Sequence, residues 1–223
     1  IDTASAAIKL VGVHTRGNSP AFATGSGGMG ETQHRLVPSP SETPRHGTNP
    51  HFLFNALNSV EALSRRAPER IPELVRGLST YLRYCLQPAQ DGWATLQEEL
   101  DALASYLYVE KVRFEDQFEV EFEIAEAVWC QRVPQFFLQP LVEDVLREGI
   151  GAGPTPLRVV ISCQRLERRL RVEVRDTGVG SGRAIVGGGG LKDLFRRLDL
   201  LYKDGGYRWA LNPQNNYKET QGY

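Results

Sequence analysis

A histidine in the first turn of an expected helix is the strongest candidate for chemistry in this chain. His51 follows Asn49-Pro50, and a proline just after an asparagine cap is typical of a helix start. An imidazole exposed there has a ring nitrogen that can accept a phosphoryl group and form a phosphoramidate. Asn55 lies one turn further along the same face, where its amide could position an attacking water or a partner group. The alternative is that His51 is only a polar residue of the first turn.

Two glycine-containing segments would suit a nucleotide. Asp176 precedes Gly178 and Gly180 at the end of an expected strand; its carboxylate can accept a hydrogen bond from the adenine amine, and the glycines let the backbone approach the base. An ordinary strand-end turn has the same pattern. Further on, Gly187 to Gly190 run into a helix that we expect to start at Leu191, and backbone N–H groups at such a start favour phosphate. A flexible linker would look similar, and the GKS or GKT of a P-loop is absent.

Adjacent acids stand on an otherwise apolar helical segment. Glu143 and Asp144 could each offer oxygen to Mg²⁺. Neighbouring helix positions point about 100° apart, so only one of them should face a pocket. The alternative is a solvated face on which Glu143, Arg147 and Glu148 form ordinary surface pairs.

The elements that must hold these residues follow from hydrophobic periodicity. A 3.6-residue rhythm predicts a helix from Pro50 to a turn at Pro68, and a second from about Pro72 until Pro88 closes it. Two amphipathic helices joined by a short turn form a hairpin, which alone has too little core and tends to dimerise. A third helix is expected over Gln97 to Phe114.

The period changes after residue 115. Apolar and glutamate residues alternate over Phe118 to Ile124, which predicts a half-exposed strand. Mixed strands and helices then indicate an α+β fold with one sheet and helices on one face. The expected elements are a helix over Phe137 to Arg147, antiparallel strands over Leu157 to Cys163 and Leu170 to Asp176, a loop over Gly178 to Gly190, a helix over Leu191 to Tyr202 and a strand over Tyr207 to Leu211.

Residues 1–48 differ from the rest in composition. Gly, Ser, Thr and Pro dominate from Gly17 to Thr48, and such a segment buries little and orders poorly. Ala6 to Thr15 could form one short strand. We expect a linker or a poorly ordered upstream segment without chemistry of its own.

Composition narrows the class of protein. With 26 basic and 27 acidic residues and a net charge of −1, the chain lacks the basic excess of a nucleic-acid binder. No apolar run approaches the roughly 20 residues that span a bilayer, so any membrane anchor would lie in an upstream segment absent here. Sparse, widely spaced Cys85, Cys130 and Cys163 fit a reducing cytosol.

Taken in order, these segments resemble the LytS/YehU-type sensor histidine kinases over about Asn49 to Leu211. The phosphoacceptor box is the most specific match, and the family's other signatures follow it along the chain. The matching segments are Asn49 to Ser59 for the phosphoacceptor box, Tyr81 to Tyr84 and Tyr106 to Phe114 for two helical signatures, Gln139 to Gly149 for the N-box, and Asp176 to Gly180 and Gly188 to Leu191 for two G-boxes.

The resemblance implies the cytoplasmic part of a two-component signalling protein. Residues 49–114 would be the helical dimerisation and phosphoacceptor region of a homodimer, and residues 115–223 a GHKL (Bergerat) ATP-binding sandwich with a lid over residues 181–190. His51 would take a phosphoryl group from ATP and pass it to a response regulator, and Asn55 occupies the place of a residue that aids dephosphorylation of that partner. Nucleotide contacts would come from Asp144, Arg147, Asp176, Gly178, Gly180, Gly188, Gly190 and Leu191, with Mg²⁺ on Asp144 or, as second choice, Glu143.

Three acids stand where the family usually has other residues. Asp144 and Asp193 replace asparagines, and Glu148 replaces a histidine. Added charge beside the triphosphate would weaken nucleotide binding unless the metal offsets it. The alternative is therefore a degenerate kinase-like module with weak or no ATP binding, acting as a dimeric regulatory or interaction protein. A GHKL ATPase of the gyrase or chaperone kind fits less well, because that class lacks the His51 box and usually has a glutamate where Pro140 stands.

Overall fold

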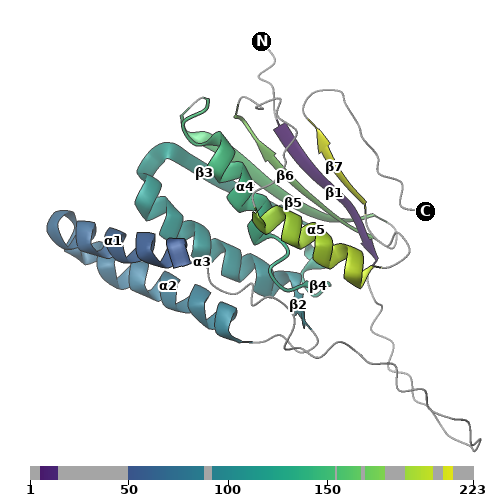
Figure 1. The fold of residues 1–223 in the computed structure, drawn as a ribbon, viewed down its shortest axis with the longest axis horizontal. Coiled ribbons are helices and arrows are strands. Elements are labelled where there is room, and N and C mark those ends of the chain that lie inside the picture. The colour runs from purple at the N-terminus through teal and green to yellow at the C-terminus, as the bar shows by residue number, and fades with distance from the viewer. Residues whose placement is uncertain are drawn as a thin grey trace, which may run out of the picture.

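The protein combines a layer of helices with a mixed sheet. The computed structural model describes residues 6–14, 50–87, 92–153, 155–166, 169–178, 189–202 and 208–212, of which the first and last segments are described as backbone only. Three long helices lie beside a five-stranded sheet that carries two further helices (Figure 1). The expected α+β class is confirmed.

The predicted hairpin is present with nearly the expected bounds. Helix α1 spans Pro50–Arg66, a 3-10 turn spans Pro68–Arg70, and helix α2 spans Ile71–Leu86. Proline near the start of each segment costs no helical hydrogen bond, because the first N–H groups have no acceptor there. The two helices lie along α3, at the side of the molecule away from the sheet (Figure 1).

Helix α3 spans Leu96–Phe114, as predicted to within one residue. Thr95 caps it with a reciprocal pair of bonds: its hydroxyl accepts from the N–H of Glu98, and the Glu98 carboxylate accepts from the N–H of Thr95. A small two-stranded sheet, which the sequence did not predict, precedes the cap: β2 (Trp93–Thr95) pairs with β4 (Arg132–Pro134). The short 3-10 turns Glu115–Gln117 and Glu126–Val128 flank the next strand.

The main sheet has the strand order β3-β5-β6-β1-β7. Its expected antiparallel pair is confirmed, because β5 and β6 pair antiparallel, while β3 lies parallel to β5. The strands are β3 (Phe118–Ile124), β5 (Leu157–Leu166), β6 (Arg169–Asp176), β1 (Ala6–His14) and β7 (Arg208–Asn212).

Strand β1 corrects the expectation for residues 1–48. Residues 6–14 do form the short strand, but this strand is no linker: it lies inside the sheet and pairs antiparallel with both β6 and β7. The register places Ala6 opposite Asp176. The backbone N–H and C=O groups of β1 are hydrogen-bonded by the strands on its two sides. The composition of residues 1–48 does not predict this pairing.

Helices α4 (Gln139–Gly149) and α5 (Gly189–Leu201) lie against one face of the sheet (Figure 1). That face carries the alternating buried residues of β5 and β6, such as Val159, Ile161 and Val174. The opposite face is polar and includes the ion pair between Arg175 and Glu123, at 2.9 Å. Helices on one face were expected, whereas α4 starts two residues later than predicted.

One continuous hydrophobic core joins the hairpin, α3, the sheet and its two helices. Phe52 of α1, Leu103 of α3, Leu141 of α4 and Leu194 of α5 all belong to it. A bilayer crossing would need a longer and more apolar helix than any found among the described residues.

Candidate functional site

His51 occupies the first turn of α1 and is exposed. The next residue anchors it: Phe52 is 3% exposed and its ring contacts Tyr81 of α2 and Tyr106 of α3, with centroids 4.9 and 5.0 Å apart. Aromatic pairs at these separations add about 0.5–1.5 kcal/mol to the area they bury. The three rings therefore hold the start of α1 on the other two helices while the imidazole faces outward.

Asn55 reaches back to the imidazole from one turn later. Its Nδ2 lies 3.2 Å from Nδ1 of His51, and its own carbonyl accepts from the Ser59 hydroxyl at 2.9 Å. A side-chain amide can turn either its NH₂ or its oxygen toward the ring. With the oxygen toward Nδ1, the ring proton sits on Nδ1 and the Nε2 lone pair is available as a nucleophile.

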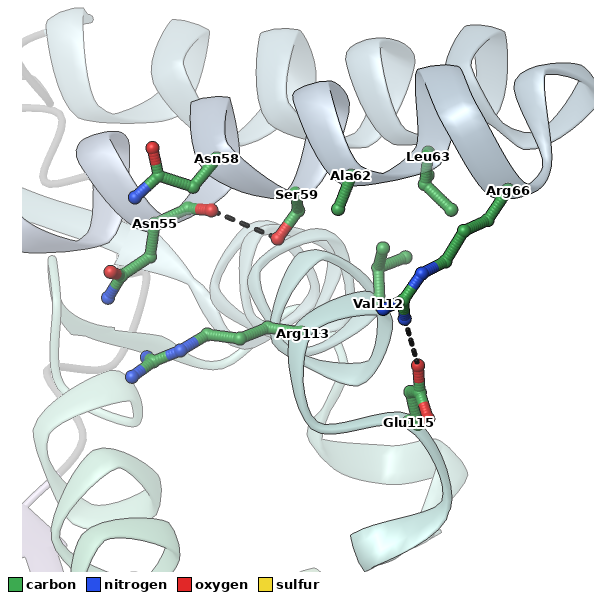
Figure 2. Close-up of a pocket in the computed structure, with 9 residues that line it drawn as sticks. All are labelled: Asn55, Asn58, Ser59, Ala62, Leu63, Arg66, Val112, Arg113 and Glu115. Atoms are coloured by element: carbon green, nitrogen blue, oxygen red, sulfur yellow. Dashed lines mark hydrogen bonds and ion pairs between the residues drawn. The ribbon is translucent and has the colours of Figure 1, made fainter.

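A polar groove continues from Asn55 along α1. It has a volume of about 320 Å³ and is lined by residues of α1, the end of α3 and Glu115 (Figure 2). In Figure 2 the Asn55 and Asn58 amides and the Arg113 guanidinium extend toward the same end, whereas Arg66 pairs with Glu115 at the other. Because Asn55 lines the groove and also contacts His51, one end of the groove lies next to the imidazole.

Asp176 ends β6 in a buried turn. It is 8% exposed, and its Oδ1 accepts from the N–H of Gly178 at 2.8 Å. A Cβ on Gly178 would lie 2.7 Å from that oxygen and 3.5 Å from Cα of Gly149, so a side chain there would have to displace the Asp176 carboxylate. Burial raises the pKa of Asp176, and the Gly178 bond acts in the opposite direction.

Thr177 fastens the same turn to the neighbouring strand. Its N–H donates to the carbonyl of Arg158, and its hydroxyl accepts from the N–H of Arg158, both at 3.0 Å. The turn therefore has one defined position beside the end of α4, where Gly149 packs against Leu157. A carboxylate held in one position can accept a hydrogen bond from the amine of a base, and backbone close to it can pack against the flat ring.

Asp144 lies on α4 and is 2% exposed. Arg147, one turn later, donates to its carboxylate and also to Glu148, at 3.2 Å from Nε. Partial burial lowers the pKa of Arg147, but the nearby Asp144 and Glu148 carboxylates outweigh it and raise that pKa. Asp144, one of the three acids that depart from the family pattern, thus has the Arg147 cation beside it.

Glu143 faces a different part of the molecule from Asp144, as adjacent helix positions predict. Its carboxylate accepts from Gln139 at 2.6 Å, and Gln139 donates to the hydroxyl of Tyr81 at 2.7 Å. Burial raises the pKa of Glu143. The Gln139 side chain therefore joins α4 to α2 and Glu143 is bonded to it, so Asp144 is the better placed of the two acids for a metal.

The glycine segment before α5 is described only at its end. Helix α5 begins at Gly189, two residues earlier than expected, and a Cβ added at Gly190 would lie 3.8 Å from Cβ of Pro140 of α4. Leu191 is 2% exposed within the core, so only its backbone could contact a ligand. Gly180 and Gly188, like most of the expected lid, lie outside the described residues.

Glu99, a buried glutamate that was not among the predicted site residues, links α2 and α3 to the loop before α4. Glu99 of α3 is 3% exposed and accepts from Tyr84 of α2 and from the backbone before α4. One signal was present in the sequence: Glu99 falls on the same helical stripe as Leu96, Leu103 and Tyr106, where a charged side chain is unexpected.

Among the described residues, no group of three or more His, Cys, Asp or Glu side chains lies close enough together to hold a metal ion. Magnesium in phosphoryl-transfer sites is commonly bound by one or two carboxylates together with the substrate phosphates, so a single acid on α4 fits that mode. Asp144 is the acid on α4 that could serve in this way, and Arg147 donates to it.

Known proteins resemble this chain in sequence. The family model for histidine kinases matches residues 44–118, which include α1, α2 and α3. The sensor histidine kinase YpdA of Escherichia coli K12 is 34% identical over 175 residues, which are 74% of this chain and 31% of that protein. Sensor protein LytS of Staphylococcus saprophyticus is 31% identical over 208 residues, 87% of this chain and 35% of the relative. Sensor histidine kinase BtsS of Escherichia coli K12 is 38% identical over 128 residues, 57% of this chain and 23% of the relative. The chain thus spans about a third or less of these relatives.

Proposed function

Because the chain belongs to the LytS-type sensor histidine kinases, we propose that it is an ATP-dependent kinase portion in which His51 is phosphorylated and passes its phosphoryl group to a response regulator. One observation carries this proposal. His51 is exposed at the first turn of a firmly anchored helix, with the Asn55 amide 3.2 Å from its Nδ1. A nucleophilic imidazole needs access for a large donor together with a fixed tautomer, and this arrangement supports both when the Asn55 amide turns its oxygen toward Nδ1.

The chemistry is an in-line displacement. The Nε2 lone pair attacks the γ-phosphorus of ATP, the N–P bond forms, the bond from that phosphorus to the β–γ bridging oxygen breaks, and ADP leaves with the electron pair. The proton on Nδ1 stays on the ring. The Nδ1–H group donates a hydrogen bond to the Asn55 side-chain oxygen, which stabilises the positive charge on the phosphorylated imidazole. In the second transfer a regulator aspartate attacks the same phosphorus and the imidazole leaves.

The nucleotide would bind on the side of the sheet that carries α4 and α5, in a GHKL-type domain spanning residues 115–223 together with β1. The Asp176 carboxylate would accept from the adenine amine, with Gly178 and Gly180 beside the base. Gly188, Gly190 and the backbone at Leu191 would approach the phosphates. Asp144 would hold Mg²⁺, which neutralises charge on the phosphates, and Arg147 would contact the phosphates or remain on Asp144.

A second function is favoured by one observation, the ion pair between Asp144 and Arg147. If this pair persists when nucleotide is present, the metal loses its ligand. The chain would then be a regulatory module that keeps the kinase fold and binds ATP weakly or not at all. A measurement of ATP affinity distinguishes the two functions, because the kinase must bind ATP and the regulatory module would bind it weakly or not at all.

The outer face of the hairpin supports the proposal of a homodimer. Phe54 is 67% and Leu57 58% exposed on α1, and Val75 and Leu86 of α2 are also exposed apolar residues. A hairpin of two helices buries such a stripe by packing against a second copy into a four-helix bundle. Residues 49–114 would supply this region, working in the cytoplasm, where ATP is available.

The test is phosphorylation of the purified chain with Mg·ATP. We expect acid-labile, alkali-stable phosphohistidine, and we expect His51→Ala to abolish it while ATP affinity is unchanged. His34→Ala is the matched control and should behave like the parent chain. Phosphate retained in His51→Ala would contradict the role of His51, and absence of ATP binding in the parent chain would favour the regulatory module.

A further inference from the structure

The buried carboxylate of Glu99 gathers donors from two directions. The Tyr84 hydroxyl and the Phe136 N–H, at 2.5 Å, donate to one oxygen. The N–H groups of Phe137 and Leu138 donate to the other, at 2.9 and 3.1 Å. Leu138 is the N-cap of α4 and makes no side-chain cap bond, so Glu99 of α3 satisfies the backbone donors ahead of that helix in place of a local cap.

Further contacts fasten the same loop. Arg197 of α5 donates to the carbonyl of Phe136 at 3.0 Å. Gln135 donates to the carbonyls of Tyr84 and Gln87 at the end of α2, at 3.2 and 3.1 Å. Residues 135–138 are therefore bound at once to α2, α3 and α5.

The backbone of this loop is held in an uncommon conformation. Phe136 has φ = +58° although it is not glycine, and its ring contacts Tyr84 with centroids 5.3 Å apart. A left-handed conformation costs a residue of this type about 1–2 kcal/mol, and such strain persists only where surrounding contacts impose it. The contacts with Glu99, Arg197 and Tyr84 impose it here.

The link runs from the loop to the histidine through α2. Tyr84 lies one turn after Tyr81, and Tyr81 packs on Phe52, the residue that anchors His51. At the other end the loop leads directly into α4, which carries Asp144, and it is bound to α5. Few contacts thus separate the histidine from the helices of the proposed nucleotide side.

We propose that Glu99 is a positioning residue for phosphoryl transfer: it ties the start of α4 to α2 and so fixes the nucleotide-side helices relative to His51. This inference rests on the proposed kinase function. Glu99 contacts neither His51 nor, in the proposed site, the nucleotide. Its removal should therefore leave ATP affinity intact and slow the transfer, because displacing reacting groups by 1 Å costs on the order of 100-fold in rate.

Two variants test the link at different points. Tyr84→Phe removes one hydroxyl, which cuts the bond from α2 to Glu99 and leaves the three backbone donors in place. Glu99→Gln keeps the shape but turns an NH₂ group toward at least one backbone N–H. For both, we expect the rate of His51 phosphorylation at saturating ATP to fall about 10- to 100-fold, with the KM for ATP and the Kd of Mg·ATP within about twofold of the parent. The double variant should be no slower than the slower single variant, since both act through one link.

Asp101→Asn is the matched control, a carboxylate-to-amide change on an exposed position of the same helix, and should keep the parent rate. If Glu99→Gln fails to fold, Tyr84→Phe carries the test. Parent rates at saturating ATP in folded variants, with or without a rise in the Kd of Mg·ATP, would overturn the inference while leaving the kinase function standing. A parent chain that binds ATP but never phosphorylates His51 would overturn the proposed function and the inference with it.

Discussion

Arg147 pairs with Asp144 one turn earlier on α4, and the Asp144 side chain is 3% exposed while that of Arg147 is 50% exposed. An acid at this position would by itself add negative charge beside a triphosphate, and Arg147 places a positive charge next to it. The guanidinium offsets the carboxylate before any metal arrives, and solvent reaches only the arginine.

Removing the arginine should therefore destabilise the fold. In Arg147→Ala the carboxylate stays buried without its counter-charge, and we expect the free energy of unfolding to fall by about 1–3 kcal/mol, less than for a fully buried pair because Arg147 is half exposed. Urea denaturation measures this. The double variant Asp144→Asn/Arg147→Ala should recover most of the loss. Asp144→Asn alone should raise Mg·ATP affinity if the added charge weakens binding, whereas a drop in that affinity would mean that Asp144 is itself a good Mg²⁺ ligand. Equal stability of Arg147→Ala and the parent would show that the pair contributes nothing.

The contact between Asn55 and His51 predicts a rate effect on the first transfer. Asn55→Ala removes the group that selects the Nδ1-protonated tautomer, so phosphorylation of His51 should slow by about 10-fold, with ATP affinity unchanged. Asn55→Asp can accept from Nδ1–H only, and should retain more activity than the alanine variant. Asn58→Ala, on the same helix, serves as the control. If the alanine variant is as fast as the parent, and only dephosphorylation of the regulator changes, Asn55 acts on the partner and not on the imidazole.

Recognition of adenine by Asp176 should depend on pH. Its folded-state pKa is raised by burial, so the carboxylate accepts from the adenine amine above that pKa and loses this capacity as the pH falls through it. The preference for ATP over the triphosphate of purine riboside, which lacks the amine, should thus be large at pH 8 and shrink toward pH 5. Comparing two triphosphates cancels protonation of the phosphates. Asp176→Asn should weaken ATP binding, because its NH₂ can face the amine, and should flatten the pH dependence; an unchanged preference would contradict the contact.

The close approach at Gly178 predicts that a side chain there would displace the Asp176 carboxylate. A Cβ there would meet Oδ1 of Asp176 at 2.7 Å and Leu157 at 3.4 Å, so Gly178→Ala should cost about 1–3 kcal/mol of stability and weaken ATP binding by moving Asp176. Gly189→Ala is the control for stability, because a Cβ at Gly189 meets nothing within 4 Å and alanine is a better helix former than glycine. Thermal unfolding compares the two variants, and nucleotide titration measures the ATP affinity of Gly178→Ala. A neutral Gly178→Ala would mean that the turn can open without cost.

The exposed stripe on the hairpin predicts the oligomeric state. Leu57→Lys places a charge in the proposed dimer interface and should yield a monomer by sedimentation or light scattering. Leu200 of α5 is similarly exposed, at 64% against 58% for Leu57, and Leu200→Lys should leave the dimer unchanged. A parent chain that is monomeric at high concentration would end the proposal of a hairpin dimer.

Local patterns in the sequence were enough to predict most elements and to place the candidate residues on them. The bounds of α1, α2 and α3 agree with the periodicity to within about one residue, because a helix forms from neighbouring residues and its apolar stripe is written at a fixed period. The strand-end turn at Asp176 and the first-turn position of His51 are local in the same sense. The family resemblance rests on those same short segments.

Contacts between distant segments were decided only by the tertiary structure. Strand β1 finds its place between β6 and β7, more than 150 residues away in sequence, and no pattern within residues 6–14 names its partners. The adjacent acids Glu143 and Asp144 look alike in sequence, yet one bonds Gln139 and the other Arg147. Glu99 shows the reason most clearly: a carboxylate can be buried only where several donors converge on it, and its donors come from Tyr84 and from residues 136–138, which only the packing of α2, α3 and α4 brings together.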